Sequence, residues 1–240
     1  MRIARRSRNT AIGGAVAVLL LTAASTPAAA ARYVDLRQIE PIHGDAAAGQ
    51  KKAAVCSACH GATGVSVAPT FPRLAGQRAD YLYHRLVSFK RAAPKDPYYS
   101  TSPMTPIVAN LSDTDMRDLA TYFSSQTPTP PATAAAATPR GKGEALFLTG
   151  DPARGTPPCQ GCHGADAAGP SISTGQYAAY PSLRGQYAPY LIARLTNFHK
   201  HLPDDTTNDF IMGSVAQTMD EESIQAVATW LSLLTPDRNL

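Results

Sequence analysis

Apolar residues recur at helical spacing near the middle of each half of the chain. They stand at Leu82, Leu86 and Phe89 in the first half, and at Leu191, Leu195 and Phe198 in the second. Positions i, i+4 and i+7 lie on one face of an α-helix, so each set predicts an amphipathic helix. Asp80 is the expected N-cap of the first helix, and Pro189 is expected in the first turn of the second.

A further helix is predicted at the end of each half. Ser112 with Asp115 forms a capping signature before one of these helices, and Asp220, followed by two glutamates, precedes the other. The apolar faces that follow are Met116, Leu119, Ala120 and Phe123, and Ile224, Val227, Leu231 and Leu234. Since no segment alternates convincingly between apolar and polar residues, we expect an all-α fold with long loops.

The two halves are copies of one unit. Nine residues of the first half recur in the second at a constant offset of 109: Pro72, Leu74, Gly76, Gln77, Tyr81, Leu82, Arg85, Leu86 and Phe89. At an offset of 108, Met104, Val108, Asp113 and Tyr122 correspond to Met212, Ala216, Glu221 and Trp230. Two cysteine motifs further upstream are 103 positions apart, so the second copy has six extra residues, which we place within "SISTGQYAAY".

The composition divides the chain into four parts. Residues 1–31 predict a cleavable secretory signal peptide, because arginines precede an apolar run and a small-residue stretch that ends at Ala31. That run is about 14 residues long, short of the roughly 20 that a spanning helix needs. A Pro/Ala/Thr-rich linker at 127–142 separates two predicted domains, 32–126 and 143–240. We therefore expect a periplasmic protein, with peripheral membrane association left open.

The net charge of +4 comes from the predicted signal peptide, which holds four of the 22 basic residues and no acidic ones. Removing it leaves 18 basic and 18 acidic residues. Residues 32–126 hold 11 basic and 8 acidic groups, whereas 141–240 hold 6 and 10, an asymmetry that could orient a partner during encounter. The chain lacks the clustered basic and aromatic residues typical of nucleic-acid binding.

All four cysteines lie in two copies of one hexapeptide, "CSACHG" at Cys56–Gly61 and "CQGCHG" at Cys159–Gly164. Cys-x-x-Cys-His is the attachment sequence of haem c: two thiols hold the porphyrin, and the histidine ligates the iron. The sequence therefore predicts two covalent haem c groups, on Cys56, Cys59, Cys159 and Cys162, with His60 and His163 as proximal ligands. We expect the glycine after each histidine to let the backbone pass close to the haem.

Other uses of these cysteines fit less well. A thiol-disulfide redox pair predicts one motif and gives no reason for the histidines. A four-cysteine zinc site expects its pairs roughly 15 to 20 residues apart, whereas these are about a hundred apart. Disulfides between the halves would also leave both histidines unexplained.

Each iron needs a sixth ligand or an open position, and methionine is the expected ligand. Met104 lies 44 residues after His60, and Met212 lies 49 after His163, both at predicted loop positions before the last helix. Met116 and Met219 occupy core-facing helix positions, where packing accounts for them.

Four further histidines are possible ligands. His84 lies on the face of its helix away from Leu82 and Leu86, so we expect it at the surface. His199 and His201 follow the corresponding helix of the second half and are alternatives to Met212, and His43 is expected to be solvated.

These residues resemble a known family. Each half is similar to a class I cytochrome c domain, and the tandem resembles the dihaem cytochrome c4 family through "CSACHGATG", "PRLAGQRADYLYHRLVSFKR" and "MTPIVANLSDTDMRDLATYF". The block Pro-x-Leu-x-Gly-Gln-x-x-x-Tyr, present twice, makes the resemblance more specific.

The resemblance implies a periplasmic electron carrier with two His/Met haems that passes electrons toward a terminal oxidase. It also implies that a backbone carbonyl at Pro72 and at Pro181 orients the ligand histidine. The expected partners are redox proteins: a membrane terminal oxidase, and an upstream quinol-oxidising complex or dehydrogenase. We expect no enzyme activity and no small-molecule substrate. The alternatives are a dihaem peroxidase, a haem subunit of a periplasmic dehydrogenase and a ligand-sensing haem module.

Overall fold

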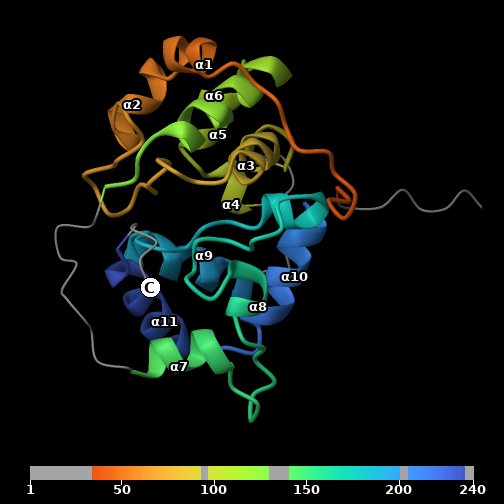
Figure 1. The fold of residues 1–240 in the computed structure, drawn as a ribbon, viewed down its shortest axis with the longest axis vertical. Helices are drawn as coiled ribbons and strands as arrows, with labels where there is room; N and C mark the ends of the chain where they lie inside the picture. Colours follow the sequence, from red (N-terminus) through yellow and green to blue (C-terminus); the bar gives the residue numbers. More distant parts are fainter. Residues whose placement is uncertain (1–33, 93–96, 130–140, 201–204, 236–240) are drawn as a thin grey trace, which may run out of the picture. The chain divides into compact units, whose positions relative to one another are not determined.

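The computed structural model describes residues 34–92, 97–129, 141–200 and 205–235, and within these ranges it contains helices and two isolated β-bridges. The first half forms α1 (Ala46–Lys52), α2 (Ala54–His60), α3 (Ala79–Ala92), α4 (Pro97–Ser100), α5 (Met104–Val108) and α6 (Asp113–Ser125). The second forms α7 (Lys142–Thr149), α8 (Gln160–His163), the 3-10 helix η1 (Gly175–Ala179), α9 (Ala188–Lys200), α10 (Thr207–Ala216) and α11 (Glu221–Leu233). The predicted all-α class is confirmed (Figure 1).

The same helix packing recurs in both halves. α6 lies against α1 and α3, and α11 lies against α7 and α9 (Figure 1). A glycine allows the close crossing in each half: a Cβ on Gly49 of α1 would lie 2.1 Å from the Asp118 carbonyl oxygen of α6, and one on Gly143 of α7 would lie 2.2 Å from that of Ala226 in α11. The repeat in the sequence is therefore a repeat in the structure.

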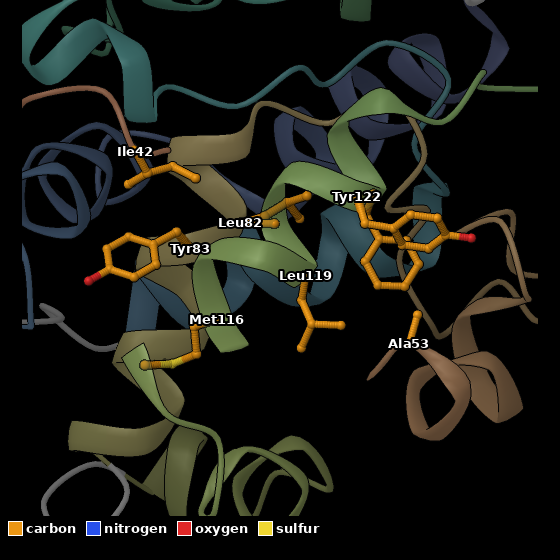
Figure 2. Close-up of a cluster of buried hydrophobic side chains, with 9 residues drawn as sticks. Ile42, Ala53, Leu82, Tyr83, Met116, Leu119 and Tyr122 are labelled. Atoms are coloured by element: carbon orange, nitrogen blue, oxygen red, sulfur yellow. The ribbon is translucent and has the colours of Figure 1, made fainter. Parts of the chain in front are cut away.

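Each half has its own apolar core, built from the predicted helix faces. In the first half, side chains of α3 and α6 gather around Leu119, which is 1% exposed (Figure 2). In the second half, the core contains Phe147, Leu191, Ile224, Val227 and Leu231. The faces of the two terminal helices were predicted correctly, down to the capping box of Ser112 with Asp115 and the N-cap at Asp220.

Two local predictions were wrong. α3 begins at Ala79, so Asp80 lies in its first turn, and its carboxylate accepts a hydrogen bond from the backbone N–H of Ile42 at 2.9 Å instead of capping the helix. Met219 is buried as expected, but it precedes α11 and does not lie on it.

Glutamine side chains join the two halves symmetrically, and both halves belong to one compact unit. Gln77 accepts a hydrogen bond from the backbone N–H of Ser182 at 2.9 Å and donates one to the Ser182 carbonyl at 2.8 Å. Gln186 makes the same pair with Arg73, at 2.9 and 3.0 Å. Because these residues are equivalent in the repeat, the contacts are related by a pseudo-twofold axis.

The extra residues of the second copy also contact the first half. They include η1, which lies against α3. Arg78 donates from Nε to the Ala178 carbonyl at 3.1 Å, and its terminal nitrogens donate to the carbonyls of Pro170 and Tyr177 at 3.1 and 3.2 Å. In the second half the equivalent residue, Tyr187, donates from its hydroxyl to the Ser66 carbonyl of the first half, so the insertion gives Arg78 further acceptors at a contact that both halves make.

Of the helices described, none is long and apolar enough to cross a membrane. The predicted signal peptide, residues 1–31, lies outside the described residues, as do positions 130–140 of the predicted linker.

Candidate haem sites

Each Cys-x-x-Cys-His motif ends a short helix with its histidine. In the first half, Cys56 and Cys59 lie in α2, which ends at His60. In the second half, Cys159 is the N-cap of α8, which ends at His163. Both histidines are buried, at 5% and 6% exposure, while the second cysteine of each motif is exposed.

A proline carbonyl fixes the orientation of each histidine ring. Nδ1 of His60 lies 2.9 Å from the carbonyl oxygen of Pro72, and Nδ1 of His163 lies 3.0 Å from that of Pro181. A carbonyl only accepts, so each Nδ1 carries the hydrogen and each Nε2 keeps a lone pair, as a metal ligand requires. Burial lowers the pKa of both imidazoles against the opposing effect of these carbonyls, which favours the neutral form.

A glycine follows each histidine for a steric reason. Gly61 has φ of +77° and Gly164 of +78°, a region that other residues rarely adopt. A Cβ would also lie 2.4 Å from the Val65 carbonyl oxygen in the first half, and 2.3 Å from that of Gly169 in the second. Loop backbone is thus a close neighbour of each glycine, and the close approach of each glycine to the haem stays a prediction.

The methionines predicted as sixth ligands lie on helices. Met104 is the first residue of α5, and Met212 lies within α10, whereas loop positions were expected. Both side chains are half-buried. Met212 lines the same cavity as Cys159, Cys162 and His163, so the structure brings the four predicted site residues of the second half together. For the first half, the pairing of His60 with Met104 stays a prediction.

The cavity beside His163 has a volume of about 200 Å³ and a largely apolar lining from both halves. Four buried side-chain polar atoms in the described part of the chain have no hydrogen-bond partner: Nε of Arg73, Nη1 of Arg194, and the side-chain nitrogen and oxygen of Asn208. All three residues line this cavity. Buried polar atoms are rarely left unpaired, so these atoms, with the thiols, imidazole and thioether, fit a cavity that takes a haem.

The other histidines differ in their surroundings. His84 was expected at the surface, but it is half-buried and lines the cavity, and burial together with Arg117 lowers its pKa to about 4. Nδ1 of His199 lies 2.9 Å from the Ala216 carbonyl oxygen. His43 is exposed as expected, and His201 lies outside the described residues.

The cysteines lack the features of a redox pair. All four are free. Burial, with a contribution from Cys59, raises the pKa of Cys56, and burial raises that of Cys159 to about 11. Reactive Cys-x-x-Cys pairs have lowered thiol pKa values, so this environment favours attachment to a cofactor over disulfide exchange.

The contacts between the halves were not predictable from the sequence. The recurrence of Gln77 as Gln186, and of Arg85 as Arg194, was visible in the repeat, but it did not show that these side chains reach across to the other copy. The ion pair of Arg85 with Asp209, 3.1 Å between nitrogen and oxygen, had no signal in the sequence.

Two helical domains, each with a Cys-x-x-Cys-His helix and a histidine held by a proline carbonyl, define a tandem c-type cytochrome. The Cytochrome c family model matches the chain twice, at residues 46–127 and 142–235. Cytochrome c4 from Azotobacter vinelandii is 41% identical over 194 residues, 78% of this chain and 88% of that protein. The chain belongs to the dihaem cytochrome c4 family.

Two further relatives bear on its role. The crystal structure of reduced recombinant cytochrome c4 from Pseudomonas stutzeri has a TM-score of 0.65 and 37% identity, and the match covers 80% of this chain and all of that one. A thiosulfate dehydrogenase electron acceptor from Stutzerimonas stutzeri is 35% identical over 75% of this chain and 79% of its own length. The chain is accordingly a dihaem c-type electron carrier with two covalent haem c groups, and both cysteine motifs have the required pattern.

Proposed function

We propose that this chain carries single electrons in the periplasm between respiratory redox proteins, toward a terminal oxidase. Its donor would be a quinol-oxidising complex or a dehydrogenase. The observation that carries the proposal is the equivalent support of the two ligand histidines by Pro72 and Pro181. Two haem sites that are built alike are suited to electron transfer. A catalytic haem differs, because it needs an open position at the iron and acid/base side chains of its own.

In the proposal, His60 with Met104 would hold one haem iron, and His163 with Met212 would hold the other. The haem iron supplies a reversible one-electron change, and methionine ligation raises its potential relative to two histidines. A histidine and a methionine that the protein holds in place in both oxidation states would keep the geometric change on electron transfer small. The protein's part is to hold the ligands and exclude water, which the buried histidines and the largely apolar cavity support.

The experiment is reduction and reoxidation of the holoprotein by candidate partners. Membranes that contain the terminal oxidase should reoxidise the reduced protein, with a rate that falls as salt is added, since the proposed encounter is electrostatic. Oxidation that does not depend on the terminal oxidase, or no oxidation of the protein at all, would contradict the proposed direction of electron transfer. Turnover of hydrogen peroxide by the pure protein, lost in Met104→Ala or Met212→Ala, would favour the dihaem peroxidase instead.

A second candidate is electron acceptor of a periplasmic dehydrogenase. It is favoured by the similarity to two thiosulfate dehydrogenase electron acceptors, the second from Thiomonas intermedia at 36% identity. Rapid reduction of this protein by a thiosulfate dehydrogenase with thiosulfate, and slow reduction by a quinol-oxidising complex, would select this function. The reverse result would select the respiratory one.

A further inference from the structure

The cavity beside His163 is lined by more positive than negative charge. Arg73, Arg85 and Arg194 line it, while Asp209 is the one carboxylate among its lining residues. Asp209 lies 3.1 Å from Arg85 and 3.8 Å from Arg194, and all three side chains are buried, at 8%, 13% and 8% exposure. One buried carboxylate therefore faces two guanidinium groups, and a buried charge without a counter-charge is costly.

Neighbouring groups do not remove this excess. Asp205, four residues before Asp209 in the chain, pairs with Arg91 at 3.4 Å, so its charge is already matched. His84 adds no charge near neutral pH, because burial and Arg117 lower its pKa to about 4. The excess positive charge of the arginines around the cavity would therefore be balanced by a bound anion.

Arg194 is held in place by its neighbours, but one of its nitrogens has no hydrogen-bond partner. Its guanidinium contacts the rings of both Tyr98 and Phe198, 4.5 and 4.4 Å from their centroids. Nη2 points toward Asp209, whereas Nη1 is buried and has no partner. The side-chain amide of Asn208, next to Asp209 in the chain, is also buried and unpaired. Arg194 and Asn208 both line the cavity, where an arginine nitrogen and an amide nitrogen can donate to a carboxylate.

We propose that Nη1 of Arg194 and the side-chain nitrogen of Asn208 donate hydrogen bonds to a carboxylate of haem c, one of the propionate groups of the porphyrin. The source is the haem of the second half, because its attachment residues Cys159 and Cys162 line the same cavity. Arg85, from the first half, supports the site through Asp209. The inference requires covalent haem, and it is independent of which redox partners the protein serves.

The pairing has a consequence for the haem potential. A carboxylate neutralised by Arg194 does not stabilise the ferric iron, so removing the arginine should lower the potential of that haem. The carboxylate pKa should rise as well, because the nearby positive charge favours its ionised form. The potential of the variant should therefore depend on pH more steeply than that of the original protein near neutrality.

The experiment compares four variants of the holoprotein in redox titrations at several pH values. Arg194→Gln removes the charge, Arg194→Lys keeps it without the planar fork, and Asn208→Ala removes the amide. Arg154→Gln, at an exposed position of the same half, removes a charge away from the cavity. Nuclear Overhauser contacts from the haem methyl groups to each half identify which haem shifts, and resonance Raman spectra follow the propionate bending mode.

Arg194→Gln should shift the reduction equilibrium of the second haem at least tenfold, which is 59 mV for one electron, with a smaller shift in Arg154→Gln. Arg194→Lys should recover part of the potential, and Asn208→Ala should move the propionate mode. Equal shifts in Arg194→Gln and Arg154→Gln would overturn the proposal. If Arg194→Gln does not mature, an unchanged propionate mode in both Arg194→Lys and Asn208→Ala would do so. A shift confined to the haem of the first half would overturn the assignment of the carboxylate to the second.

Discussion

The paired glutamines should hold the two halves together, and Gln77→Ala tests this most simply. The Gln77 side chain makes three hydrogen bonds: two with the backbone of Ser182, at 2.8 and 2.9 Å, and one from the backbone N–H of Arg78 at 2.9 Å. The residue is 6% exposed, so water does not freely replace it. At about 1 kcal/mol net for each bond, the substitution should cost roughly 2–3 kcal/mol.

The assay is urea unfolding of the holoprotein, followed by far-ultraviolet circular dichroism. Gln186→Ala should cost a similar amount, because its bonds to Arg73 repeat those of Gln77. Gln225→Ala is the matched control: this residue is exposed, and its side chain binds Glu221 at 3.1 Å on the same helix. The control should change stability by no more than about 0.5 kcal/mol.

The double variant shows whether the two glutamines belong to one interface. If the halves come apart once both pairs are lost, the single transition should separate into two, one for each half. Losses below about 0.5 kcal/mol in both single variants, no larger than those of an ordinary surface change, would refute the reasoning that these bonds stabilise the contact.

Three further predictions concern the sites and the charges around them. Gly164→Ala should cost roughly 1–3 kcal/mol because of its backbone conformation, while Gly161→Ala, which has open space around it, should be neutral; equal losses by thermal unfolding would contradict this. The hydrogen bond from Lys52 lowers the pKa of Asp118, so this pair should stabilise the protein above about pH 4 and lose its effect as the pH falls through the lower folded-state pKa. Asp118→Asn should flatten that part of the stability profile, and an unchanged profile would count against it. Met212→Ala should keep both haems attached but lower one potential, and two unchanged potentials would exclude Met212 as a ligand.

The helices that carry the cores were predictable because their apolar faces are periodic and their ends are marked. Ser112 with Asp115 is an example: the capping box follows from local sequence and is present in the structure. The haem-attachment sites were equally predictable, because covalent attachment of haem c needs two thiols and a histidine at one fixed spacing. The proline carbonyls followed from the family resemblance, and the structure confirms them.

Contacts between the halves were not predictable in the same way. His84 was assigned to the surface because the periodicity describes one helix and its own core, and it does not show what the other half covers. Met212 was placed in a loop because α10 has a weakly periodic sequence. In the sequence, Arg194 was only one of the residues that are identical in the two halves. Its role depends on Asp209, and the first half has no aspartate at the equivalent position.

The most direct test of the central claim is a redox titration of protein matured in a periplasm. It should follow the haem absorbance together with the weak long-wavelength band of methionine sulfur on ferric iron. The account predicts two high-potential one-electron steps, both accompanied by this band. A low-potential step without the band would mean that one iron has another sixth ligand or none, and it would contradict a carrier with two histidine/methionine haems.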